Sequence, residues 1–275
     1  MNGSAANVSV IVQYRDSFTK AVIKNVIILV VGIFINYINL SLIHTFCKHQ
    51  VFYMNPRYIL FIHLVINDLI QVNVTIMLFV ISYHLQDQHL HVGCSCSAGR
   101  VATENSPLNL ACMALECYSA VCFPLHHLQV WTIKRTLTLI LLMWTTTTTH
   151  GVPTRHHHTK RDVTYALFLV IIWITIFYTY FQILLTAKTA GKDTVKARNT
   201  IILHSFQLLL CMASYLAPAL KDLLKKLFPK NSTDILFVSY IVVQVLPRST
   251  SPMIYGLRDP TFRKYLKRYM LARSS

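Results

Sequence analysis

The chain has 275 residues, of which 54% are hydrophobic and 13% are charged, and its mean hydropathy is +0.47. So few charges cannot cover a soluble globule of this size, which excludes a soluble protein. The net charge of +16 comes from basic residues scattered along the chain and not gathered in one soluble domain. This scatter favours anionic lipid head groups, and not nucleic acid, as the partner of the basic residues.

Long apolar segments predict an all-α membrane protein, because a helix of about 20 apolar residues crosses the hydrocarbon core with its backbone amides satisfied internally. Two segments are weaker than the rest: one begins with a polar run, and another ends in five threonines. Hydropathy alone gives five or six spans. We expect seven spans, at residues 22–46, 58–83, 96–123, 132–149, 163–186, 198–220 and 235–257.

The basic residues between these segments set the orientation. With seven spans, the Lys and Arg of three connections and of the tail fall on one side, which the positive-inside rule makes the cytoplasm. The lysines between residues 221 and 230 run against this rule. We expect an extracellular N-terminus at 1–21, a receptor-sized bundle at 22–257 and a cytoplasmic tail at 258–275. Three sequons fall outside, at Asn2, Asn7 and Asn231.

Three motifs carry a resemblance to a known family. Residues 113–125 read M-A-L-E-C-Y-S-A-V-C-F-P-L, which resembles the M-A-x-E-R-Y-x-A-x-C-x-P-L end of the third helix in odorant receptors. Residues 196–204 resemble the K-A-x-x-T-x-x-x-H start of the sixth helix, and residues 251–258 resemble the N-P-x-x-Y-x-L-R end of the seventh. The chain is thus similar to the fish odorant receptors, rhodopsin-like G-protein-coupled receptors.

The resemblance implies a plasma-membrane receptor that binds a small odorant between its helices and activates a stimulatory, olfactory-type G protein to raise cyclic AMP. It implies no enzyme activity, no cofactor and no resident metal. It assigns G-protein coupling to a set of residues near the cytoplasmic ends of the third and sixth spans: Glu116, Cys117, Tyr118, Lys196 and Arg198. It assigns a sodium site and an activation switch to Asn36, Asp68, Ser251, Pro252 and Tyr255.

Asp68 lies at bilayer depth, where a charge costs roughly 3 kcal/mol on insertion scales unless it faces a polar cavity. The alternative to a sodium site is a carboxylate satisfied by Asn36 and neighbouring hydroxyl groups. The ligand candidates in the outer halves of the spans are Asn105, Tyr178 and Tyr215, although most aromatic residues here serve packing. After the last span, residues 262–269 have the spacing of a short amphipathic helix on the inner leaflet.

Two departures from the family pattern bear on signalling. Cys117 stands where the family has an arginine, and a thiol offers neither its charge nor its planar fork. The predicted second outer loop, residues 150–162, is short and contains no cysteine for the family's disulfide. They leave open a non-signalling or truncated product retained in the endoplasmic reticulum. A remote alternative is a small transporter that uses the intramembrane charges.

Overall fold

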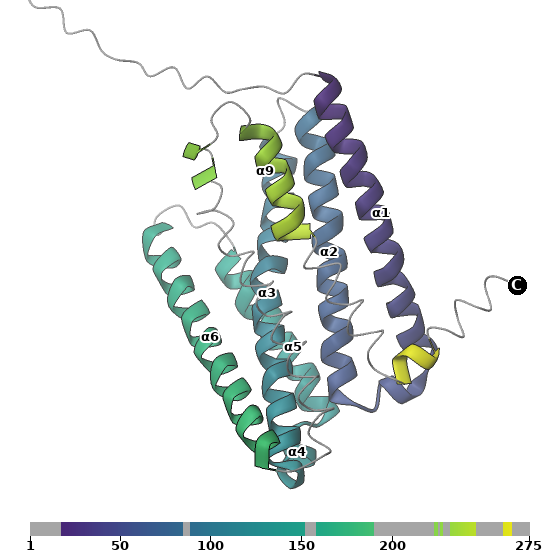
Figure 1. The fold of residues 1–275 in the computed structure, drawn as a ribbon, viewed down its shortest axis with the longest axis vertical. Helices are drawn as coiled ribbons and strands as arrows, with labels where there is room; N and C mark the ends of the chain where they lie inside the picture. The colour runs from purple at the N-terminus through teal and green to yellow at the C-terminus, as the bar shows by residue number, and fades with distance from the viewer. Residues whose placement is uncertain are drawn as a thin grey trace, which may run out of the picture.

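The computed structural model describes residues 18–84, 89–151, 158–189, 223–224, 226–227, 232–245 and 261–265. These residues form helices and the short connections between them (Figure 1). The long helices are α1 (Phe18–Lys48), α2 (Pro56–His84), α3 (His89–Cys122), α5 (Ile133–Gly151) and α6 (His158–Thr189). The shorter elements are η1 (Gln50–Phe52), α4 (Pro124–Val130), α9 (Ser232–Tyr240) and a π-helical turn, η2 (Ile241–Val245).

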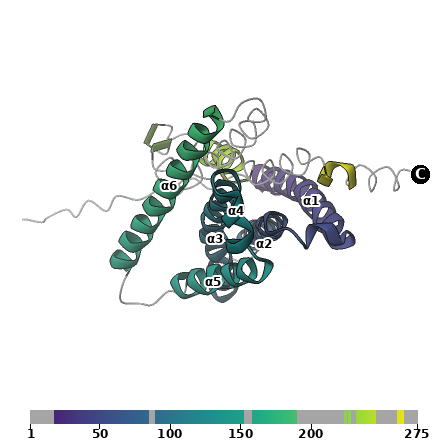
Figure 2. The same ribbon diagram turned by 90° about the horizontal axis from the view of Figure 1, so that it is seen from below.

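The helices are arranged around α3. It packs against α2, α5 and α6, and α2 packs in turn against α1. Figure 2 shows α3 in the middle of the bundle, with α5 on the side opposite α9. Between α2 and α3, an apolar cluster that includes Leu64 and Leu110 lies beside the hydrogen bonds of Asn67 and Asn109. On the side of α6, Ile172 and Ile176 pack against Ala111 and Ala114 of α3.

Apolar side chains cover the outside of this bundle. On α1, Val30, Ile33 and Phe34 are 61% to 66% exposed, and α6 exposes a similar apolar stripe that includes Ile171, Ile174 and Phe181. Polar side chains such as Asn39, Asn67 and Asp68 are buried instead. Apolar groups outside and polar groups inside are the arrangement expected when the surrounding solvent is lipid.

Among the described residues, two helical stretches are long and apolar enough to cross a membrane, Val22–Lys48 and Pro56–Leu78. A shorter apolar stretch is Val170–Thr186. The first five expected segments fall on helices α1, α2, α3, α5 and α6, except that Phe123 and Thr132 lie one residue outside α3 and α5. The sixth segment, and the seventh beyond residue 245, lie outside the described residues.

The two segments that looked weakest are continuous helices. The threonine run is helical, and its hydroxyl groups donate to carbonyl oxygens three or four residues earlier, as Thr147 does to Met143 at 2.9 Å and Thr148 to Trp144 at 2.7 Å. The expected loop at 150–162 was therefore too long: α5 continues to Gly151 and α6 begins at His158. Residues 152–157 lie outside the described residues.

At the end of the bundle where α1 meets α2, aromatic residues form a second core. Phe52 of η1 is fully buried, with ring centroids 5.0 Å from Tyr58 and 4.8 Å from Phe262. Phe262 belongs to the helical segment 261–265, and its ring also lies 5.7 Å from Phe61. The apolar face expected to lie on the inner leaflet thus buries Phe262 against protein.

Candidate functional site

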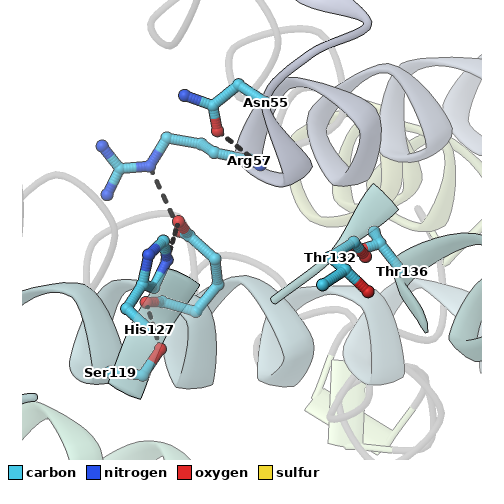
Figure 3. Close-up of polar contacts among 7 residues, drawn as sticks. Asn55, Arg57, Ser119, His127, Thr132 and Thr136 are labelled. Atoms are coloured by element: carbon cyan, nitrogen blue, oxygen red, sulfur yellow. Dashed lines mark hydrogen bonds and ion pairs between the residues drawn. The ribbon is translucent and has the colours of Figure 1, made fainter. Parts of the chain in front are cut away.

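The carboxylate of Glu116 is the centre of the best-defined polar site. Glu116 lies in the last turns of α3 and is only 3% exposed. Arg57 Nε donates to Glu116 Oε2 at 3.2 Å, and His127 Nε2 lies 3.1 Å from Oε1. Figure 3 shows Arg57 and His127 approaching the same carboxylate, one at each oxygen. Both oxygens therefore have a partner from another segment of the chain.

The start of α2 fixes the position of Arg57. Asn55 precedes the helix, and its side-chain oxygen accepts a hydrogen bond from the backbone N–H of Arg57 at 3.1 Å. Pro56 occupies the first helical position, where its missing N–H costs nothing. An asparagine cap followed by proline is a strong helix start. It places Arg57 in the first turn, where the helix dipole disfavours a cation unless an anion lies beside it.

The turn between α3 and α4 fixes the position of His127. The N–H of Phe123 donates to Ser119 O at 3.0 Å and so closes α3, and Pro124 starts α4 at its first position. The N–H of His127 then donates to Phe123 O at 2.9 Å. This tight reversal brings the His127 ring, 11 residues after Glu116, back to the carboxylate.

The Glu116 carboxylate is buried, so its contacts with Arg57 and His127 are needed to offset the cost of removing it from water. Removing a carboxylate from water costs several kcal/mol unless cations and donors offset the loss. The side chain of Glu116 is 4% exposed, against 34% for Arg57 and 17% for His127. Arg57 is permanently charged, whereas His127 is charged only when protonated. Arg57 is thus the permanent counter-charge of Glu116.

A second polar group joins α2 to α3 about halfway along the bundle. Asn67 Nδ2 donates to Ala102 O and to Ser106 Oγ, both at 2.8 Å. Its neighbour Asp68 is 3% exposed. Asn67 Oδ1 is buried without a hydrogen-bond partner among the described residues. The side-chain amide of Asn67 thus bridges α2 and α3.

Asn36 of α1, which was expected at the sodium site with Asp68, has a hydrogen-bond partner on another part of α2. Asn36 Nδ2 donates to Asn73 Oδ1 at 2.9 Å, on a more exposed part of the α1–α2 interface. Asn39, one helical turn later, is fully buried, and neither polar atom of its side chain has a partner in the described part of the chain. Sequence reasoning missed Asn39. Its spacing of three residues from Asn36 was the available signal.

The ligand candidates do not gather in one place. Asn105 is fully buried in α3, and both polar atoms of its side chain lack a partner among the described residues. Tyr178 is 55% exposed and its ring lies 6.2 Å from that of Tyr118, at the Glu116 end of α3. Tyr178 thus lies away from the outer half where it was expected. Tyr215 lies outside the described residues.

Comparison with known proteins identifies the fold of this site. Residues 38–166 match the family described as "7 transmembrane receptor (rhodopsin family)". This range contains Arg57, Glu116 and His127. Over 271 residues the chain is 28% identical to Odorant receptor 131-2 of Danio rerio, a match that covers 87% of this chain and 83% of that protein. Residues 38–166 thus resemble part of a rhodopsin-type seven-transmembrane receptor, and most of the chain is similar to a fish odorant receptor. Both comparisons are with receptors.

The chain carries Cys117 next to Glu116, at the arginine position of the odorant-receptor motif that residues 113–125 resemble. Cys117 is half-buried. The ring of Tyr118 packs 5.7 Å from that of Phe123. The motif end of α3 is thus well packed although its arginine is missing, and the basic partner of the acid comes from α2.

Several expected functional residues of the receptor lie outside the described residues. They are the switch residues Ser251, Pro252 and Tyr255, the coupling residues Lys196 and Arg198, and the sequon asparagines Asn2, Asn7 and Asn231. The cysteines that the structure describes, Cys47, Cys112, Cys117 and Cys122, are all free thiols.

One contact at the opposite end of the bundle was missed from sequence. Lys20 and Lys24 of α1 bind the two carboxylate oxygens of Asp234 in α9, at 3.1 Å and 2.8 Å. Lys24 Nζ also lies 5.6 Å from the ring centroid of Phe237. These contacts join the first helix to one that is more than 200 residues later in the chain.

Proposed function

We propose that this receptor is an odorant receptor of the plasma membrane, with seven spans and an extracellular, glycosylated N-terminus. A small odorant binds between the helices and favours an active arrangement, which activates a stimulatory G protein and raises cyclic AMP. The observation that carries the proposal is the similarity to Odorant receptor 131-2 across 87% of the chain.

Exposed side chains at the Glu116 end of the bundle support the proposal that a G protein binds there. Two leucines of α4 are among its most exposed apolar residues, with Leu125 at 83% and Leu128 at 78%. They lie one helical turn apart, beside the polar residues His126 and Gln129. Apolar side chains that project from a polar rim are typical of docking surfaces. Lys196 and Arg198 complete this surface in the proposal.

Buried polar side chains in the interior of the bundle support the proposal that a ligand bound there controls activation. Asn105 offers a buried amide without a partner in the described part of the chain, which suits it to orient a polar group of an odorant in an apolar cleft. The buried carboxylate of Asp68, together with Asn36, would hold a sodium ion that stabilises the resting receptor. Tyr215 is the second proposed contact from the opposite side of the cleft, and Ser251, Pro252 and Tyr255 form the proposed switch.

A non-signalling product retained in the endoplasmic reticulum is the alternative suggested by Cys117 and the short second outer loop. It predicts no response to any ligand and an immature glycan. The ordered packing around Glu116, and the family match that spans it, favour the signalling receptor.

The test is an odorant screen on cells that express the full chain with an N-terminal tag and an olfactory stimulatory G protein. We expect at least one small volatile or water-soluble compound to raise cyclic AMP in proportion to surface expression. Asn105→Ala should shift or abolish that response, whereas Asn73→Ala, an exposed position on α2, should leave the ligand selectivity unchanged. Surface-expressed receptor that gives no response with any G protein would contradict the proposal.

A further inference from the structure

Glu116 of this receptor has a basic partner although the family's arginine is missing. We propose that Arg57, assisted by His127, holds the Glu116 carboxylate in the resting receptor and so takes over the task of the arginine that Cys117 replaces. The inference rests on the proposed signalling function, and it names the residues that set its basal level. Arg57 is a positioning residue in this account, since it acts through the end of α3.

Geometry is the first argument. The guanidinium of Arg57 reaches Oε2 of Glu116 from α2, and the imidazole of His127 reaches Oε1 from α4. The contact with Arg57 spans 59 residues of sequence. A neighbouring arginine at position 117 would hold the acid only within α3. Arg57 instead ties the end of α3 to the start of α2, so the lock of this chain joins two helices.

Charge balance is the second argument. A carboxylate that is 4% exposed needs a nearby cation, and a thiol at position 117 cannot supply one. Arg57 in turn lies in the first turn of α2, where the helix dipole disfavours positive charge. Arg57 therefore offsets the cost of burying the Glu116 carboxylate, and Glu116 offsets the repulsion between Arg57 and the dipole of α2. The substitution at Cys117 is thus compensated electrostatically at the end of α3.

The consequence for signalling follows from what activation requires. Opening a cleft at this end for the G protein requires the end of α3 to change its contacts, and the Arg57–Glu116 pair resists that change. Weakening the pair should raise the fraction of active receptor in the absence of odorant. A contact with a purely structural role would instead lose stability and signalling together.

The experiment compares Arg57→Ala, Glu116→Gln, their combination and Arg57→Ala with Cys117→Arg, with Lys134→Ala as the control. Lys134 is an exposed cation at the same end of the bundle, so its removal changes the net charge equally. Two quantities are measured on the full chain: the thermal unfolding midpoint in detergent, and basal cyclic AMP per receptor at the cell surface. The midpoint requires neither a G protein nor an odorant.

We expect Arg57→Ala to lower the midpoint by roughly 2 to 5 °C and to raise basal cyclic AMP about 3- to 10-fold, in line with a partly exposed ion pair. The same change in the Glu116→Gln background should have little further effect, because the partner is already neutral. Adding Cys117→Arg to Arg57→Ala should return the counter-charge to Glu116 but not the tie between α2 and α3, so the midpoint and basal cyclic AMP should recover in part. Should Arg57→Ala fail to fold, Arg57→Lys, which keeps the charge but not the fork, should give intermediate values.

Three results would overturn the proposal: Arg57→Ala indistinguishable from Lys134→Ala, an Arg57→Ala effect of equal size with and without Glu116, or no rescue by Cys117→Arg. If no variant shows G-protein activity but the midpoints follow the expected cycle, the pairing stands and the proposed signalling function fails. If basal activity and odorant responses are present but the midpoints do not follow the cycle, the signalling function stands and the pairing fails.

Discussion

Asn67 joins α2 to α3 through one side-chain amide, which donates to the carbonyl oxygen of Ala102 and the hydroxyl oxygen of Ser106. Asn67 is 1% exposed, so bulk water cannot reach its two acceptors and replace the lost hydrogen bonds. Loss of the amide would leave two buried acceptors with one donor fewer.

We expect Asn67→Ala to lower the free energy of unfolding by about 1 to 3 kcal/mol, the usual cost of leaving buried polar groups unpaired. Thermal or denaturant unfolding of the purified receptor measures the change. Asn73→Ala is the control on the same helix, because the hydrogen bond between Asn73 and Asn36 lies on a more exposed part of the α1–α2 interface. Equal losses for the two variants would show that burial does not set the strength of this contact.

At the residue scale, sequence could predict which residues are chemically unusual but not what they contact. Glu116 and Cys117 stood out by their motif. Arg57 was interpreted only as a charge at the membrane boundary, because nothing local links it to an acid 59 residues later. The pairing depends on how α2, α3 and α4 are brought together, which is a property of the tertiary fold.

At the element scale, α1 and α2 approach each other at Gly32. A Cβ atom built on Gly32 would lie 2.3 Å from Ile76 Cδ1 and 2.9 Å from Ile76 Cγ1. Real Cβ atoms do not come this close, so any larger residue must displace Ile76 or separate the helices. Small residues permit such close approach between membrane helices.

We expect Gly32→Ala to lower the unfolding midpoint, and Gly32→Leu to lower it much further, because overpacking costs about 1 to 3 kcal/mol. Shortening the opposing side chain tests the cause directly. In the Ile76→Val background, which removes Cδ1, Gly32→Ala should be better tolerated than in the native chain. An alanine at position 32 that costs the same with either partner would argue against the steric account.

The pair of lysines on α1 gives the contact with α9 a pH dependence. Hydrogen bonds from Lys24 and then Lys20 hold the pKa of the Asp234 carboxyl below its usual value. A carboxyl with a lower pKa in the folded state stabilises the fold above its unfolded pKa of about 3.9, and this contribution is lost as the pH falls through the folded pKa.

The stability advantage of the native chain over Asp234→Asn should therefore be present at neutral pH and disappear below about pH 4. Because Asp234 is exposed, the advantage should be small and should shrink in high salt. Unfolding midpoints of the two proteins across this pH range provide the measurement. A difference that does not vary with pH would show that the carboxylate charge is not its source.

At this scale, sequence could predict most helices but not their lengths. Apolar composition identified the segments that became α1, α2 and α6. The threonine run before Gly151 looked like the end of a weak span, because threonine disfavours helix interiors in water. In the bundle, the backbone of this run is helical, and its hydroxyl groups donate to carbonyl oxygens of the preceding turn.

At the scale of the whole molecule, composition and periodicity were sufficient to predict an all-helical membrane protein, and the family match agrees. They could not predict that the tail residue Phe262 packs into the aromatic core with Phe52 and Phe61, because apolar faces look alike whether they meet lipid or protein. The seven-span topology of the receptor still depends on the positions of the sequons and of the basic residues.

The most direct measurement of this account is antibody labelling of full-length receptor in intact cells, with one tag at the N-terminus and another at the C-terminus. Glycan maturation is followed in parallel on the native chain and on a variant with Asn2 and Asn7 changed to Gln. An exported seven-span receptor predicts an N-terminal tag that is labelled on intact cells, a C-terminal tag that is labelled only after permeabilisation, and a mature glycan lost in the variant. Both tags on one side of the membrane, or a chain left entirely with an immature glycan, would contradict it.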